Sequence, residues 1–220
     1  MVGNMSLKAV IFDFDGTLAK LNTDFSLMRS VILDLISVYN IPLDGLRDLF
    51  VLEMIEAGRR LISGANPRRE VDYIKEANRL VSDIEIKAAK EGKLIDGIRQ
   101  MLGELKARNI KVGVVSRNCS EAVREVFPDI DTFCKAVITR EFTTNVKPHP
   151  IHIRTALDAL DVTPEHSAMV GDHPMDIGIG KEAGAYTIGV LTGYSQADPL
   201  REAGADLVIN SAAEIVKYLP

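Results

Sequence analysis

The chain has 220 residues, of which 46% are hydrophobic and 26% are charged. This composition is typical of a globular protein with a sizeable core and excludes extensive disorder. The net charge of −5 argues against a nucleic-acid partner, because proteins of that class carry a basic surface. An anionic ligand must then be attracted locally, by a cation or by backbone amides.

The sequence also bears on cellular context. No apolar run is long enough to cross a bilayer, and the N-terminus lacks the basic region and long apolar core of a signal peptide. We therefore expect a cytoplasmic protein without a membrane partner, with Met5 as an alternative start to Met1. Cys119 and Cys134 match no zinc or redox spacing, so reduced, partly buried thiols are favoured over a disulfide.

The first element is a short apolar run from Val10 to Phe12 that ends at Asp13, with Gly16 close behind. A continuous apolar run followed by a glycine predicts a buried parallel strand and a tight loop.

Residues 22–92 have a different pattern, with apolar residues at helical spacing and no strand signals. Helices are expected over 24–39, from Pro42 and Asp44 onward, and from Pro67, with Asn66 as its N-cap. The residues assigned to the buried faces are Leu27, Val31, Leu35 and Val38, then Leu46, Phe50, Met54 and Ile55, then Val71, Ile74, Ala77, Val81, Ile84 and Ala88.

From residue 96 onward, strands and helices alternate. Strands are expected over 111–116, 136–138, 167–170, 186–190 and 207–209, and helices over 98–108, 120–126, 150–160, 175–183 and 212–219. This alternation predicts an α/β fold with a Rossmann-like parallel sheet covered on both faces, and such sheets bind ligands at the carboxyl ends of their strands. The expected domains are an α/β core over 1–21 and 93–220 and an inserted all-helical domain over 22–92.

Two carboxylates lie just past the first strand, at Asp13 and Asp15. Such a pair suits a hard divalent cation, and it also suits a division of labour between a nucleophile and an acid–base group. Gly16 lets the backbone turn and leaves its amides facing an anion. The stretch by itself is more typical of a simple turn.

Further polar residues follow other predicted strands. Asp172 and Asp176 come after the apolar run that ends in Gly171, where they could complete a magnesium site or simply sit at a helix N-terminus. Ser116 ends the strand expected over 111–116, and Lys147 lies in the stiff loop NVKPHP. A lysine there could neutralise a nucleophile and bind phosphate. In isolation, a solvated surface residue is favoured for Lys147, and Ser116 could be an ordinary loop-entry serine.

The polar residues that follow the predicted strands are more informative together than any one of them is alone. DFDGTL, the strand ending at Ser116, Lys147 with its proline, and Asp172 with Asp176 resemble, in order and over nearly the whole chain, the four motifs of the haloacid dehalogenase superfamily. The helical insert resembles the cap of the phosphoglycolate phosphatase and β-phosphoglucomutase branch.

The resemblance implies roles for the acidic residues. Asp13 would attack phosphorus and form an aspartyl-phosphate, and Asp15 would act as general acid and then as general base. Magnesium would be held by Asp13, by the backbone carbonyl of Asp15 and by Asp172, with Asp176 supporting the metal or orienting Lys147. The residues expected to bind the phosphoryl group are Gly16, Thr17, Ser116, Arg117 and Lys147.

The chain departs from the family pattern at two positions. Arg117 follows Ser116 where asparagine is frequent, and either a phosphate contact or a solvent-facing side chain fits it. His173 follows Asp172 where small or polar residues are usual, and a structural role is favoured over a substrate contact. For the arginines of the insert, we favour solvated helix ends over substrate contacts. These residues are Arg59, Arg60, Arg68 and Arg69.

The resemblance therefore implies a magnesium-dependent phosphatase for a small phosphorylated metabolite, with 2-phosphoglycolate as a candidate. The alternatives are a β-phosphoglucomutase-like phosphoryl transferase and a non-catalytic binding member of the family. Asp15 argues against a dehalogenase, because those enzymes typically lack an acid at that position. A monomer and a homodimer are both compatible with the sequence.

Overall fold

The computed structural model describes residues 6–42, 44–62, 67–143 and 145–219. The chain divides into two compact units, an α/β unit of Met1–Leu21 and Ala89–Pro220 and a helical unit of Asn22–Ala88. We had expected the second change of unit after residue 92, and it falls four residues earlier. Asn66, the expected N-cap, lies outside the described residues.

The α/β unit is built on a six-stranded parallel sheet with the order β5-β4-β1-β6-β7-β8. β1 lies in the middle, between β4 and β6, and Phe12 is paired with Val114 on one side and Val170 on the other. The strands are β1 (Ala9–Phe12), β4 (Lys111–Val115), β5 (Ala136–Ile138), β6 (Ser167–Gly171), β7 (Tyr186–Val190) and β8 (Leu207–Ile209).

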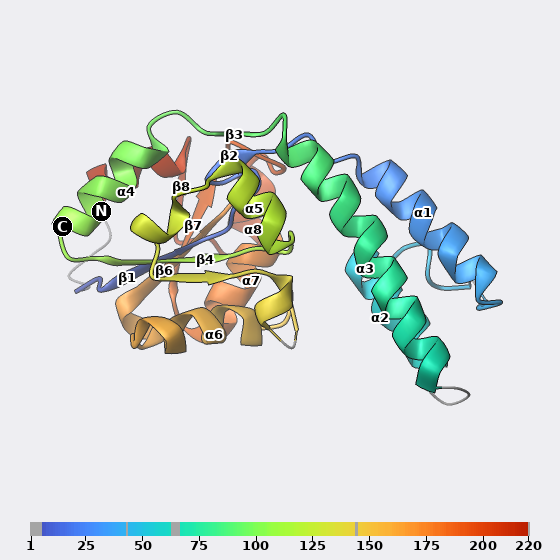
Figure 1. Ribbon diagram of the computed structural model, residues 1–220. Coiled ribbons are helices and arrows are strands. Elements are labelled where there is room, and N and C mark those ends of the chain that lie inside the picture. Colours follow the sequence, from blue (N-terminus) through green and yellow to red (C-terminus); the bar gives the residue numbers. More distant parts are fainter. Residues whose placement is uncertain (1–5, 43, 63–66, 144, 220) are drawn as a thin grey trace. The chain divides into compact units, whose positions relative to one another are not determined.

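Helices cover the sheet on both faces, and α6 and α7 lie together on the lower one in Figure 1. Every residue of β1 and β6 is buried, which explains why these strands read as continuous apolar runs. One core cluster joins Ile11 and Met169 of the sheet to Ile153 and Leu157 of α6. The helices are α4 (Ile98–Ala107), α5 (Ser120–Val126), α6 (Ile151–Leu160), α7 (Pro174–Ala183) and α8 (Ala197–Glu202).

The predicted α/β fold is confirmed, with local differences. A two-stranded antiparallel ladder, β2 (Ala19–Lys20) with β3 (Lys93–Leu94), was not expected, and neither was α8. The segment expected as a C-terminal α-helix is a 3₁₀-helix over Ala212–Lys217, a form common in short segments. The other 3₁₀-helices are Ile130–Thr132, Arg140–Phe142 and Pro164–His166.

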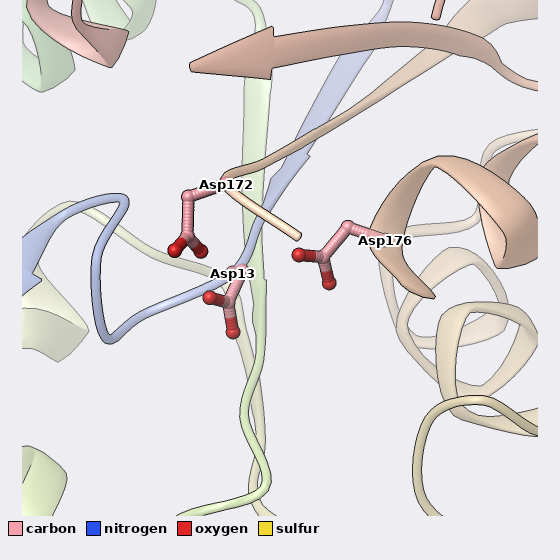
Figure 2. Close-up of side chains that lie close together, drawn as sticks. All are labelled: Asp13, Asp172 and Asp176. Atoms are coloured by element: carbon pink, nitrogen blue, oxygen red, sulfur yellow. The ribbon is translucent and has the colours of Figure 1, made fainter. Parts of the chain in front are cut away.

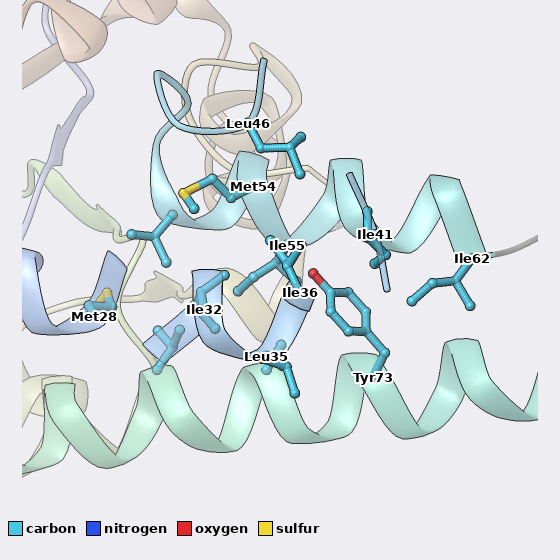
Figure 3. Packing of buried hydrophobic residues seen from close by; sticks show 13 residues of the cluster. Met28, Ile32, Leu35, Ile36, Ile41, Leu46, Met54, Ile55, Ile62 and Tyr73 are labelled. Atoms are coloured by element: carbon cyan, nitrogen blue, oxygen red, sulfur yellow. The ribbon is translucent and has the colours of Figure 1, made fainter. Parts of the chain in front are cut away.

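The helical unit contains α1 (Phe25–Val38), α2 (Val51–Ile62) and α3 (Pro67–Ala89, which ends one residue past the unit). Its core is an apolar cluster contributed by all three helices and by the segment before α2 (Figure 3). The members labelled in Figure 3 are Met28, Ile32, Leu35, Ile36, Ile41, Leu46, Met54, Ile55, Ile62 and Tyr73. Among the described residues, no helix has the length and apolar character needed to cross a membrane.

The predicted helix faces in this unit were partly wrong. α1 buries Met28, Ile32 and Ile36 and leaves Leu27 and Val38 exposed, so the buried stripe is rotated from the one we expected. α2 begins at Val51 rather than near Asp44. Residues 44–48 form turns instead, and among them Gly45 has a φ of 73° that right-handed helices do not adopt. The prediction was also wrong for Phe50 and Val71, which are exposed. It did not include Tyr73, which is fully buried in the core.

Candidate active site

Three acidic side chains from distant parts of the chain meet at the carboxyl end of the sheet. Asp13 follows β1, Asp172 follows β6 and Asp176 lies in the first turn of α7. One carboxylate oxygen of each lies within 4.8 Å of the others, and all three residues are buried. Figure 2 shows the side chains of Asp13, Asp172 and Asp176 close together at this edge of the sheet. The register of neighbouring parallel strands accounts for this meeting, because Asp13 and Asp172 follow strands that are paired side by side.

Lys147 places one positive charge among these acids. Its Nζ donates to Asp13 Oδ1 at 2.5 Å and to Asp176 Oδ1 at 2.7 Å, and the lysine is itself buried. Burial acts to lower the pKa of Lys147, but the two carboxylates outweigh it and raise that pKa. The lysine is therefore charged at neutral pH and tethers the two aspartates.

One ammonium does not balance three buried carboxylates. Burial, with the neighbouring charge of Asp13, raises the pKa of Asp172 to about 8, although a bond from the Tyr194 amide opposes the shift. Burial also raises the pKa of Asp176, against the effect of Lys147. A carboxyl group with a raised pKa favours a further cation nearby. Three hard oxygen donors are the ligand type that magnesium takes in proteins, so the residues present fit a divalent metal.

Asp176 has both carboxylate oxygens engaged. Oδ1 accepts from Lys147, and Oδ2 accepts from the backbone N–H of His173 at 3.2 Å. The side chain of His173 accepts in turn from the Met175 amide at 3.0 Å, which makes a capping box at the start of α7. Of the two roles considered for Asp176, this arrangement favours the orientation of Lys147. The ring of His173 also packs in a tilted arrangement against the ring of Tyr194, with 4.8 Å between centroids.

Asp172 is held by groups from two loops. Tyr194 donates its backbone N–H to Asp172 Oδ2 at 2.5 Å, and the Thr17 hydroxyl donates to Oδ1 at 3.4 Å. Gly16 has a φ of 86°, and a Cβ there would lie 2.4 Å from Asp172 Oδ2. Only glycine meets both demands, so the loop after β1 is shaped around this carboxylate.

The side chain of Asp15 lies apart from the three clustered carboxylates. It is half-buried, and its Oδ1 accepts from the Leu21 amide at 2.9 Å. This bond ties the carboxyl group to the end of its own loop. Asp15 was expected to give the metal its backbone carbonyl rather than its side chain, and that remains a prediction.

Ser116 and Arg117 follow β4, on the other side of β1. Ser116 is buried, its Oγ accepts from the Asn118 amide at 3.2 Å, and its backbone N–H donates to Ile138 at 3.0 Å. Arg117 Nη1 donates to the backbone carbonyl of Lys147. The guanidinium therefore supports the lysine, and its contact with phosphate remains a prediction.

Two parts of this region were missed by sequence reasoning. The loop after β7 supplies the Tyr194 amide to Asp172 and the Thr192 hydroxyl to Gly16 O at 2.6 Å. Its position at the carboxyl end of a predicted strand was a signal for it. The second is His152, which is fully buried and accepts from the Lys147 amide.

Two of the arginines singled out in the sequence, Arg59 and Arg69, have partners within the helical unit. Arg59 pairs with Glu56 at 2.7 Å and with Glu70 at 2.6 Å, and Arg69 donates to the Tyr39 carbonyl at 3.2 Å. These contacts make Arg59 and Arg69 parts of the helical unit's own packing. The two cysteines, Cys119 and Cys134, are buried and carry free thiols.

Comparison with known proteins identifies the family of this site. The model of the haloacid dehalogenase-like hydrolases matches residues 10–190. The chain belongs to the haloacid dehalogenase-like hydrolase family. It is therefore a hydrolase by family, as the four sequence motifs predicted, and the matched segment contains all the clustered acidic residues.

Individual relatives agree with this assignment. The chain is 29% identical to pyrophosphatase PpaX of Anoxybacillus flavithermus, over 98% of both chains. In fold it resembles β-phosphoglucomutase of Clostridium difficile, with a TM-score of 0.65, 21% identity and coverage of 96% and 95%. It also resembles a predicted phosphoglycolate phosphatase of Haemophilus somnus, with a TM-score of 0.65, 20% identity and coverage of 98% and 99%. These two solved structures thus share its α/β fold.

Proposed function

We propose that this hydrolase is a magnesium-dependent phosphatase that acts on a small phosphorylated metabolite through an aspartyl-phosphate. The observation that carries the proposal is the meeting of Asp13, Lys147 and Asp172 at the carboxyl end of β1, with Asp15 two residues beyond the first of them. Phosphoryl transfer depends mainly on positioning and on neutralising charge, and this site supplies both.

Asp13 is the proposed nucleophile. Its Oδ1 is held by Lys147, so we assign attack on phosphorus to Oδ2. The new bond joins this oxygen to phosphorus while the bond from phosphorus to the leaving oxygen breaks. Covalent catalysis of this kind divides one difficult displacement into two easier ones. Water then attacks the aspartyl-phosphate, which releases phosphate and restores Asp13.

Asp15 is the proposed acid–base group. It gives its proton to the leaving oxygen in the first step and takes one from the attacking water in the second. The bond from the Leu21 amide to Oδ1 holds the carboxyl group at the end of its own loop.

Lys147 and the phosphate-binding residues manage the negative charge. The ammonium lowers the repulsion between Asp13 and the substrate, and the loops carrying Gly16, Thr17 and Ser116 bind the phosphoryl oxygens. We propose that Asp13 and Asp172 hold magnesium, together with the backbone carbonyl of Asp15, and that Asp176 supports the site through Lys147. The bound metal would supply charge neutralisation and orientation of the phosphate.

The substrate class rests on two supports. The family resemblance of the motifs favours 2-phosphoglycolate, and several relatives named pyrophosphatase PpaX make pyrophosphate a second candidate. Both are small, strongly anionic compounds. In a protein with a net charge of −5, their attraction to the site would depend on Lys147 and on the bound metal.

The test is phosphate release from 2-phosphoglycolate, pyrophosphate, sugar phosphates and nucleotides, each with magnesium and with a chelator. We expect release that depends on magnesium and that Asp13→Asn lowers at least about a thousandfold, because the nucleophile is lost. A matched control is Asp158→Asn on the exposed face of α6, which should leave the rate unchanged.

Two results would redirect the proposal. Conversion of a sugar phosphate to its isomer without free phosphate would identify a phosphoglucomutase-type transferase. Equal activity of the wild type and Asp13→Asn would show that the nucleophile has been misassigned.

A further inference from the structure

His152 is a fully buried histidine whose two ring nitrogens are both engaged. It lies in the first turn of α6, and its Nδ1 accepts from the backbone N–H of Lys147 at 3.1 Å. Its Nε2 lies 2.9 Å from the backbone carbonyl oxygen of Ile138, at the end of β5. The ring thus connects the lysine loop to the last residue of a sheet strand.

The hydrogen bonds define the protonation state of the ring. Nδ1 must present a lone pair to the Lys147 amide, so the proton lies on Nε2 and is donated to Ile138 O. Burial, with the nearby charge of Lys147, lowers the pKa of His152 to about 3. The histidine is therefore neutral at every pH near 7 and acts as a fixed acceptor.

The loop around Lys147 contains two prolines, Pro148 and Pro150, which have no backbone N–H. Its hydrogen bonds therefore depend on donors from its other residues. The carbonyl of Lys147 accepts from Arg117 and its N–H donates to His152. Both backbone polar groups of the lysine are thus held by side chains.

A lysine side chain has a long, flexible stem, and the site needs its ammonium between Asp13 and Asp176, at 2.5 and 2.7 Å. The backbone of Lys147, from which that stem starts, must then be held in place. A catalytic group that loses its position lowers the reaction rate even when every reacting group is present.

We propose that His152 is a positioning residue that fixes the backbone of Lys147 and so aims its ammonium at the two aspartates. The kinetic part of this inference rests on the proposed phosphatase function, whereas the structural part does not.

The test compares two amide variants that each keep one of the two ring contacts. In His152→Asn the amide oxygen can occupy the place of Nδ1 and accept from Lys147. In His152→Gln the longer side chain reaches the place of Nε2 and donates to Ile138 O, but the acceptor for Lys147 is lost. His149→Asn is the control, because His149 is an exposed neighbour in the same loop.

We expect His152→Gln to lower kcat roughly tenfold to a hundredfold, with KM changed by less than about twofold, since uniform substrate binding is retained. His152→Asn should stay within about threefold of the wild type, and His149→Asn should match it. If His152 only filled space, the order would reverse, because glutamine replaces more of the ring volume than asparagine does. Equal or better kcat for the glutamine variant would overturn the proposal.

Nuclear magnetic resonance of the ¹⁵N-labelled chain tests positioning without using activity. We expect a coupling across the hydrogen bond between Lys147 N and His152 Nδ1 in the wild type. The Lys147 Nζ resonance should move in the glutamine variant and stay in place in the asparagine variant. Absence of the coupling, or a Nζ resonance that moves equally in both variants, would contradict the proposal even if no phosphate release were found.

Discussion

The two units of the chain differ in how deeply their interacting charged side chains are buried. In the α/β unit, Asp13, Lys147, Asp172 and Asp176 are each less than a tenth exposed and contact one another or shared partners. In the helical unit, ion pairs lie at the surface, as between Arg79 and Glu76, whose side chains are 56% and 42% exposed. Among the described residues of that unit, Glu85 is the one buried charged residue.

This difference shows what holds each unit in shape. Exposed ion pairs are worth about 0.2–1 kcal/mol, so the helical unit depends on its apolar cluster. A buried charge network has a different energetic behaviour, because removal of one partner leaves the others unpaired in a poorly solvated place. Changes at the surface of the helical unit should therefore be tolerated, and changes among the buried charges should not.

The largest expected effect comes from Lys147→Met. Without the ammonium, Asp13 and Asp176 remain buried beside Asp172, so the free energy of unfolding at neutral pH should fall by about 3–5 kcal/mol in the metal-free protein. Urea unfolding followed by circular dichroism measures the loss. Added magnesium should restore part of it, because a cation at the three carboxylates replaces the missing charge.

The control for that experiment is Lys181→Met. Lys181 pairs with Asp206 at 2.5 Å, but the two side chains are 41% and 30% exposed. Its loss should cost no more than about 1 kcal/mol. Similar losses for the two lysine variants would mean that burial does not distinguish the two networks.

The next effect is a pH dependence that His152 gives to the α/β unit. The folded pKa of about 3 lies below the ordinary value of 6.5, so the unfolded chain binds the extra proton first as pH falls. The stability from neutral His152 is complete above about pH 6.5 and is lost as the pH falls toward 3. Between pH 7 and pH 5 the wild type should lose about 2 kcal/mol more than His152→Asn. Parallel pH profiles for the two proteins would count against this assignment.

A smaller effect is expected in the helical unit from Gly58→Ala. A Cβ at Gly58 would lie 2.3 Å from the Tyr73 hydroxyl, which is buried and has no hydrogen-bond partner among the described residues. Figure 3 shows that hydroxyl pointing into the apolar cluster. Overpacking should lower the free energy of unfolding by about 1–2 kcal/mol, although alanine is the better helix former.

Two further variants check the cause of that loss. Tyr73→Phe removes the oxygen and should restore part of the stability of Gly58→Ala, because the ring carbon Cζ would still lie 2.9 Å from the new Cβ. Gly103→Ala in α4, where a Cβ would meet nothing within 4 Å, should be neutral or slightly stabilising. A loss in Gly103→Ala as large as in Gly58→Ala would exclude crowding as the reason.

The same contrast determines how much the sequence could predict. The strands were predictable because burial on both faces produces continuous apolar runs, and Asp13 and Asp172 follow directly from where those runs end. The helix faces were less predictable, because α1 contains adjacent apolar residues such as Leu27 and Met28 that define two stripes one residue apart. Only packing against α2 and α3 selects between them.

Contacts made across the fold were also beyond the sequence. His152 is one histidine among four in the chain, and nothing in its spacing indicates that it meets the Lys147 amide. The Tyr194 amide is likewise a backbone group, which carries no residue signature. Both become visible only when the sheet brings separate loops to one edge.

The short ladder between β2 and β3 has a consequence for engineering. Ala19 pairs with Leu94 and Lys20 with Lys93, so the chain leaves the α/β unit and returns to it at adjacent points. The helical unit is thus a module inserted between two anchored ends, and these ends need only a short turn to join them. Excision or exchange of this module would leave every sheet strand and all four clustered charges on one continuous scaffold, on which foreign inserts could be compared.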